Sequence, residues 1–241
     1  MKSLQESLLD DDLVDKLDKS IKDEIKAFLK HTYKGHTNCK ISRLPNKDGK
    51  YEVSSTGNIQ VKDINIEYLT DGSFIWTTVD GDFACFGCIK LKSLEGAPEK
   101  VGGGFTCMGC KSLESLKGMP EFVGGLADFT WCKSLESLEG IAREIIGGLT
   151  IESCDKITSL KPLKNSEILR YFICSGCSKL TSLEGAPKML SGAFACNNCT
   201  SLKSLKYAPK ETLDFRCRGC GAEFDQEYIR KEFNAQGLIL C

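Results

Sequence analysis

The chain has little of what catalysis, membrane insertion or nucleic-acid binding requires. Its 241 residues include only two histidines, His31 and His36, and no apolar run approaches the roughly 20 residues that span a bilayer. The formal net charge is -1, whereas binding to nucleic acid by bulk charge needs a basic excess. Walker A loops, nucleophile elbows and dinucleotide fingerprints are all missing from the sequence. We therefore expect no enzyme, no cofactor, no membrane partner and no nucleic-acid partner.

The N-terminus also lacks the apolar centre of a signal peptide, because Asp10, Asp11 and Asp12 occupy that place. We therefore expect a cytoplasmic protein without a signal peptide. Thiols stay reduced in the cytoplasm, so the 14 cysteines are expected to be buried thiols or metal ligands and not disulfides.

What the sequence does have is a repeat over its last two thirds. The fullest copy runs from Phe105 to Gly125, and its second cysteine recurs at Cys88, Cys110, Cys132, Cys154, Cys177, Cys199 and Cys220. Neighbouring copies are therefore separated by 22, 22, 22, 23, 22 and 21 residues. A fixed period in this range indicates a solenoid of stacked turns.

Each copy contains two apolar positions two residues apart, which predicts a short strand with both side chains facing inward. The first position is Phe83, Phe105, Ala127, Leu149, Phe172, Phe194 and Phe215, and the second is Cys85, Cys107, Phe129, Ile151, Cys174, Cys196 and Cys217. Two leucine positions follow, and the chain then turns, often through Gly-x-Pro as at Gly96-Ala-Pro98.

This pattern resembles the leucine-rich repeat, and most closely the BspA-like repeats of bacteria and phages with Phe-x-x-Cys-x-x-Leu and a Pro-containing return. It departs from the family in its strand Phe, in lacking a ladder Asn, and in Lys161-Pro162-Leu163, which replaces one Gly-x-Pro turn. The resemblance implies an α/β-type solenoid, a horseshoe with a parallel β-sheet on its concave face. The segment Ser7–Val14 also resembles leaders of gut-phage proteins, which would place the protein in the cytoplasm of a host cell.

Three sections are expected along the chain. Residues 1–58 predict a helix, with Leu13, Leu17, Ile21, Ile25 and Phe28 on one face, Asp10–Asp12 at its start and Gly35 as its stop, and then a hairpin of strands 39–44 and 50–54. Residues 59–222 predict the repeat array, with strands at 59–61 and 64–66 in a degenerate first repeat before the seven copies. Residues 223–241 predict a cap whose helix starts at Asp225 and packs through Phe224, Tyr228, Ile229 and Phe233.

The C-x-x-C pairs allow two interpretations. Cys85, Cys88, Cys107 and Cys110 have the ligand types of a four-thiolate zinc site. Against that, Phe129 and Ile151 replace the first cysteine in two copies, whereas the second cysteine occurs in all seven. A metal site predicts that both cysteines are lost together, so we favour a packing role for the second cysteine.

Recognition of a protein partner is the expected function, because a solenoid offers a long and rigid surface. The candidate binding residues alternate with the inward strand positions or, in the case of Tyr171, directly precede them: Phe86, Met108, Asp128, Thr130, Glu152, Tyr171, Ile173, Asn197, Arg216 and Arg218. The phage resemblance suggests an interaction or inhibitor protein. One alternative is a passive structural component of a virion or surface, and another is a zinc-binding or thiol-dependent protein. The sequence leaves the oligomeric state open.

Overall fold

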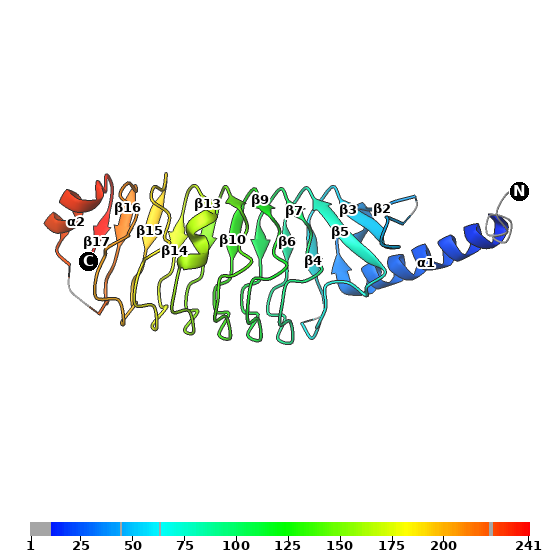
Figure 1. Ribbon diagram of the computed structural model, residues 1–241, viewed down its shortest axis with the longest axis horizontal. Helices are drawn as coiled ribbons and strands as arrows, with labels where there is room; N and C mark the ends of the chain where they lie inside the picture. The colour runs from blue at the N-terminus through cyan, green and yellow to red at the C-terminus, as the bar shows by residue number, and fades with distance from the viewer. Residues whose placement is uncertain (1–10, 44, 63, 222–223) are drawn as a thin grey trace, which may run out of the picture.

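The computed structural model describes residues 11–43, 45–62, 64–221 and 224–241, with the backbone alone for residues 11–14. The chain forms a β-solenoid of about eight turns whose strands are mostly parallel (Figure 1). Helix α1 (Asp11–Thr32) lies at one end of the stack and α2 (Gln226–Phe233) at the other. The predicted solenoid is confirmed.

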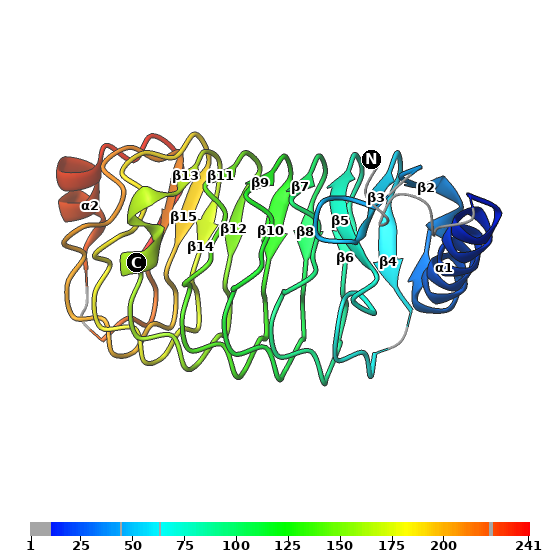
Figure 2. The same ribbon diagram turned by 45° about the vertical axis from the view of Figure 1, so that its right-hand side comes forward.

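Within the described residues the strands form two sheets that run along the stack (Figure 2). The ten-stranded sheet has the order β1 (Tyr33–Lys34), β4 (Ile59–Val61), β6 (Phe83–Ala84), β8 (Phe105–Thr106), β10 (Leu126–Asp128), β12 (Gly148–Thr150), β14 (Phe172–Ile173), β15 (Ala193–Ala195), β16 (Asp214–Arg216) and β17 (Ile239–Leu240). The seven-stranded sheet has the order β13 (Glu167–Ile168), β11 (Glu144–Ile145), β9 (Phe122–Val123), β7 (Lys100–Val101), β5 (Phe74–Val79), β3 (Tyr51–Ser55) and β2 (Cys39–Ile41). Short 3-10 helices occupy His36–Asn38 (η1) and Lys161–Asn165 (η2). None of the helices in the described part of the chain has the length and apolarity that a bilayer crossing requires.

The apolar positions of the repeat form continuous columns in space. Phe83 pairs with Phe105 in register, Phe105 with Ala127, and this pairing continues through every turn to Phe215. Both inward strand positions are buried in all seven copies, as the sequence predicted. Where the first position shrinks to Ala127, the second enlarges to Phe129, whose ring lies 6.2 Å from that of Phe105. The two positions therefore share one volume, which keeps the core filled.

In every copy after the first, the second cysteine donates a hydrogen bond to the turn before it. Cys132 Sγ lies 3.1 Å from the carbonyl oxygen of Cys107, and Cys177 Sγ lies 3.2 Å from that of Ile151. The same contact is made by Cys110, Cys154, Cys199 and Cys220. The carbonyl that accepts belongs to the second inward strand position, whatever side chain stands there. The second cysteine is thus a small apolar side chain that also supplies a buried donor, whereas the first position needs only an apolar group.

The N-terminal section confirms the predicted helix and hairpin but corrects their details. Ile25 and Leu29 are buried, yet Leu17 is 61% exposed because the first half of α1 projects from the stack (Figure 1). The helix ends at Thr32, before Gly35, since the chain then pairs as β1 with β4 in an antiparallel manner. Strands β2 and β3 form the predicted antiparallel hairpin.

Other predictions lie outside the described residues: the side chains of Asp10–Asp12, of Leu13 and of the Ser7–Val14 segment, the strand end Leu44, and position 222 at the boundary of the array.

The degenerate first turn is present, but its second strand is not. Ile59 pairs with Phe83, Val79 pairs with Val101, and Leu69 is buried like the leucines of later turns. The predicted strand at 64–66 is wrong: Ile64 and Asn65 form a turn, and the Ile64 carbonyl accepts from the amide of Ile89.

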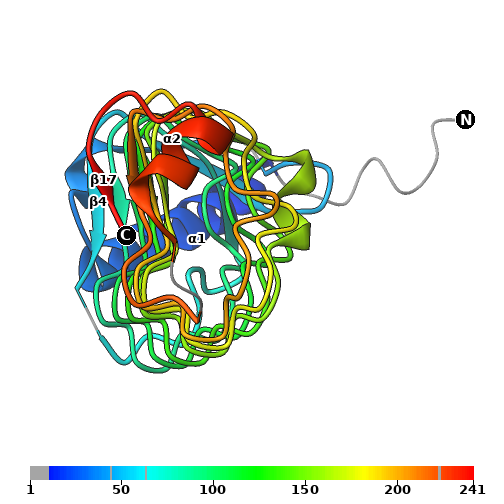
Figure 3. The same cartoon turned by 90° about the vertical axis from the view of Figure 1, so that its left-hand side faces the viewer.

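At the C-terminal end, α2 lies over the last turns (Figure 3). As predicted, Asp225 caps the helix by accepting from the amide of Tyr228 at 2.7 Å. Ile229 and Phe233 are buried, and the Phe233 ring lies 5.2 Å from that of Phe215. The sequence did not predict β17, which adds one more parallel strand beside β16. Both ends of the ten-stranded sheet are therefore covered by elements other than a regular repeat.

We predict that replacing cysteine with valine lowers the free energy of unfolding by different amounts at the two cysteine positions of one copy. Cys174→Val should lower the free energy of unfolding by less than about 1.5 kcal/mol, because other copies carry larger apolar groups there. Cys177→Val should cost roughly 2–4 kcal/mol, because it removes the donor to Ile151 and adds volume at a fully buried site. Urea unfolding followed by circular dichroism measures both values.

Cys177→Ala separates the two contributions, because it removes the donor without adding volume, and it should still cost about 1–3 kcal/mol. Equal costs for the two valine variants would contradict the role assigned to the second cysteine.

Candidate interaction surface on the ten-stranded sheet

The ten predicted binding residues lie along the strands of the ten-stranded sheet or directly beside them. Each of them directly precedes or follows a buried core residue, and each reaches solvent to some extent. Phe86, Glu152, Tyr171 and Arg218 are exposed, and Met108, Asp128, Thr130, Ile173, Asn197 and Arg216 are half-buried. Four residues of the same rows, Ala84, Thr150, Ser175 and Ala195, are buried. The structure thus brings all ten candidates to one face, which we call the sheet face.

The sheet face changes in chemistry along the stack. Its first turns present Phe86 and Met108, and its last turns present Arg216 and Arg218. Arg216 is paired with Asp214 at 3.3 Å, and its Nε atom is buried without a hydrogen-bond partner among the described residues.

Trp131, which the sequence analysis overlooked, is the most unusual residue of the sheet face. It follows Thr130, its side chain is 54% exposed, and its backbone has a left-handed φ of 63°. Four copies carry glycine at this position, namely Gly87, Gly109, Gly176 and Gly219, and two carry Ser153 and Asn198, all with positive φ. A left-handed conformation costs a bulky residue about 1–3 kcal/mol. The signal was present in the sequence, because only one copy replaces a small residue with tryptophan at this position.

The surroundings of Trp131 are polar. Its amide donates to the Glu152 carbonyl at 2.9 Å, which places the two residues on neighbouring turns. The Thr130 and Thr150 hydroxyls lie 3.4 Å apart, and an Asp128 carboxylate oxygen accepts from the Thr130 amide at 2.8 Å. The middle of the sheet face therefore combines an exposed indole ring with hydroxyl groups and two carboxylates.

A second aromatic side chain, Tyr171, lies farther along the same face. A Cβ atom at Gly192 would come within 2.7 Å of its ring, so the ring occupies the space that this glycine leaves free. The Arg170 guanidinium lies 5.4 Å from the ring centroid, within the range of a cation–π contact. The ring is therefore held in place by its neighbours and is fixed before any ligand binds.

All 14 cysteines are free thiols, and 11 of them are buried. Among the described residues, no three His, Cys, Asp or Glu side chains are placed to hold a metal ion. Burial raises the pKa of Cys132 and Cys177, and it raises that of Cys154 to about 12. Hydrogen bonds from neighbouring thiols instead lower the pKa of Cys85 and Cys110, but both side chains are closed off from solvent. Burial therefore limits the reactivity of all five thiols in the native state.

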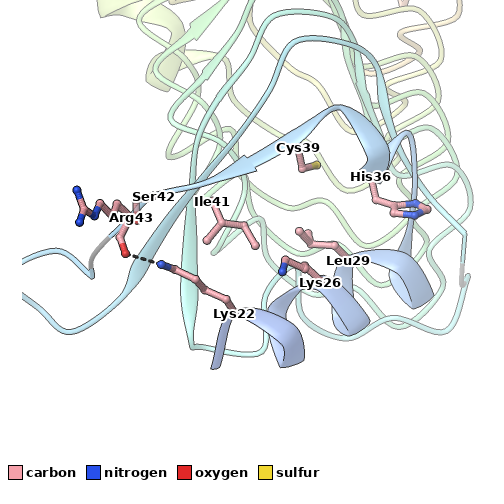
Figure 4. A pocket seen from close by; sticks show the side chains of 8 residues that line it. All are labelled: Lys22, Lys26, Leu29, His36, Cys39, Ile41, Ser42 and Arg43. Carbon is pink, nitrogen blue, oxygen red and sulfur yellow. Dashed lines mark hydrogen bonds between the residues drawn. The ribbon is translucent and has the colours of Figure 1, made fainter. Parts of the chain in front are cut away.

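A pocket of about 340 Å³ between α1 and the hairpin is lined by a cysteine and a histidine, two residue types that enzymes often use in catalysis (Figure 4). Cys39 and His36 line it, but burial raises the pKa of Cys39 to about 11. His36 Nδ1 lies 3.2 Å from the Tyr33 carbonyl oxygen, and the Lys22 ammonium donates to the Arg43 carbonyl. The Lys22 contact joins the helix to the hairpin, and the His36 contact lies within the segment that links them.

No protein-family model matches the chain, and neither a curated protein nor a solved structure is significantly similar to it.

Stability should fall at alkaline pH. The folded state keeps Cys132, Cys154 and Cys177 protonated, whereas in the unfolded chain they ionise near their ordinary value of 9.0. Above about pH 9 the unfolded state therefore binds fewer protons than the folded state. The contribution of these thiols to the free energy of unfolding is complete below about pH 9 and is lost toward pH 12, by up to about 1.4 kcal/mol per pH unit for each thiol. Urea midpoints measured from about pH 8 to about pH 11 test this, and a constant midpoint would contradict it.

In the native protein, Cys220 should be alkylated before Cys39. It is half-buried, and its contact with Cys196, at an Sγ–Sγ distance of 3.9 Å, lowers its pKa. Cys39 is equally accessible, but its raised pKa should make it slow. Iodoacetamide labelling with peptide mapping measures the order. Early modification of Cys132 or Cys154 would show that the core is not closed.

Proposed function

We propose that the protein is a non-catalytic binding module that recognises a protein partner through the sheet face. The repeats are proposed to be leucine-rich repeats of the BspA-like type, with the ten-stranded sheet on the concave side of a horseshoe. Support for this assignment comes from the buried leucine positions, such as Leu113 and Leu116, and from the parallel, in-register strands. The phage resemblance of the sequence makes a bacterial host protein the proposed partner, met in the cytoplasm.

One observation carries the proposal: Trp131 is exposed in a backbone conformation that six other copies reserve for glycine, serine or asparagine. An exposed indole gives nothing to the core, and the left-handed φ makes it unfavourable for folding. Tryptophan is the residue that most often dominates the energy of a protein interface. A function in binding explains why this side chain stands at this position.

The neighbours of Trp131 suggest how a partner is oriented. Asp128 and Glu152 form no ion pair with any described residue, so both carboxylates are free to meet basic side chains. A cation placed over an indole and beside a carboxylate gains from both contacts. The proposed partner therefore inserts an arginine or lysine at the centre of the sheet face and covers Tyr171 and Met108 with apolar groups.

Trp131→Gly provides a test that separates binding from folding. Glycine is the common residue at this position, so the free energy of unfolding should stay within about 1 kcal/mol of the original. Affinity for the partner should fall by a factor of roughly 30 or more, as expected for an interface tryptophan. Capture of a stoichiometric partner from bacterial lysate, followed by calorimetry, measures this. Tyr68→Ala is the matched control, because Tyr68 is an exposed aromatic outside the sheet face.

Three outcomes distinguish the alternatives. A partner that is retained by Tyr68→Ala and lost by Trp131→Gly supports the proposal. A partner that binds both variants equally well contradicts the sheet face as its site. A chain that captures no stoichiometric partner would instead be a passive structural component.

A further inference from the structure

Besides Trp131, a second aromatic residue, Tyr207, stands at a repeat position where most copies have glycine, in a different turn of the chain. At the return turn, Gly96, Gly118, Gly140 and Gly185 have positive φ, and in the sixth copy Tyr207 takes their place with a φ of 73°. At Gly118 and Gly185 a Cβ atom would lie 2.5 Å and 2.2 Å from the backbone of the preceding turn. A side chain at this position thus requires the turn to stand away from its neighbour. The Tyr207 side chain is nevertheless 48% exposed and adds little to the core.

Tyr207 lines a hollow of about 1120 Å³, the largest of the hollows compared in the described part of the chain. Residues of η2 and of α2 also line it. The seven-stranded sheet ends at β13, and among the described residues beyond it the bridges Met189–Glu211 and Thr212–Ala235 continue the pairing. The hollow, which we call the groove, therefore lies where the regular sheet stops, between a helix that interrupts the repeat and a helix that follows it.

The groove is lined by exposed apolar side chains and by an excess of lysines. Met189 is 60% exposed, and Leu169, Tyr207 and Tyr228 are exposed beside it. Five lysines line the groove, namely Lys161, Lys164, Lys188, Lys206 and Lys210, against three acids, Glu167, Glu184 and Glu232. Two of the acids are already paired, Glu184 with Lys161 and Glu232 with Lys210. Lys164 and Lys188 form no ion pair with a described residue, so the groove has uncompensated positive charge.

We propose that this groove binds an acidic, amphipathic peptide segment of a partner protein. Apolar side chains of the segment pack on Met189 and Tyr207, and its carboxylates reach Lys164 and Lys188. The inference goes beyond the sheet face, because it concerns a separate surface with the opposite charge preference. Nucleic acid fits less well, because the exposed apolar side chains of the groove make no favourable contact with phosphates and its three glutamates would repel them.

The experiment is a selection of random displayed peptides on the immobilised full chain, repeated with three variants. Tyr207→Gly installs the residue of the other return turns, so it should leave the thermal midpoint unchanged or raised. The double variant Lys164→Glu with Lys188→Glu reverses the free charge. Trp131→Gly alters only the sheet face and serves as the matched control. A random single-stranded oligonucleotide is titrated in parallel by fluorescence anisotropy.

The expected result is a set of enriched peptides rich in Asp, Glu and large apolar residues. Their affinity should fall by roughly tenfold or more in Tyr207→Gly and in the double variant, weaken with added salt, and stay unchanged in Trp131→Gly. Peptides that are basic, that bind Tyr207→Gly equally well or that fail to be enriched would overturn the proposal. Oligonucleotide binding that the double variant abolishes would also overturn it. Loss of the peptides in Trp131→Gly would move them to the sheet face and leave the proposed function standing.

Discussion

The burial of each turn against the next is the constraint on which the rest of this structure depends. A single turn contributes two inward strand side chains, one cysteine and two leucines, which is too little to form a core alone. Stacking joins these contributions into continuous columns, and in-register pairing brings Phe172, Phe194 and Phe215 into contact. Each turn buries its apolar side chains against the turns on both sides, so the length of the repeat varies only between 21 and 23 residues. A smaller core side chain, such as Ala127, is accompanied by a larger one nearby, Phe129.

The thiol hydrogen bonds show how strictly that constraint acts. A turn leaves one carbonyl with a free lone pair in the core, and the cysteine of the following turn supplies the donor. A serine would bring a more strongly hydrated group, and a valine would bring no donor, so cysteine meets both demands. Trp131 and Tyr207 are the opposite case. They occupy left-handed positions on the surface where folding favours glycine, so they lower stability, and we attribute their presence to the recognition proposed above.

Much of this fold could be predicted from the period. The columns, the hairpin, α2 and its Asp225 cap follow from spacing and local chemistry, because each depends on contacts that recur every 22 residues or lie close in sequence. The strand at 64–66 was wrong because Ile64 looks like a strand residue but falls at a corner, where position in the turn overrides propensity. The ten surface candidates were found by alternation, and Trp131 was overlooked because it lies in the turn just past the strand.

The sequence alone determined that the chain is a solenoid and which residues form its columns, because those properties are periodic. Tertiary structure decided what periodicity does not encode. It showed that the second cysteine is a donor, because the accepting carbonyl belongs to a different turn, about 25 residues away. It also brought η2 and α2 to one groove, although 60 residues, 166–225, separate them in the chain. Contacts between distant, irregular segments form only when the turns have stacked, so the repeat period cannot predict them.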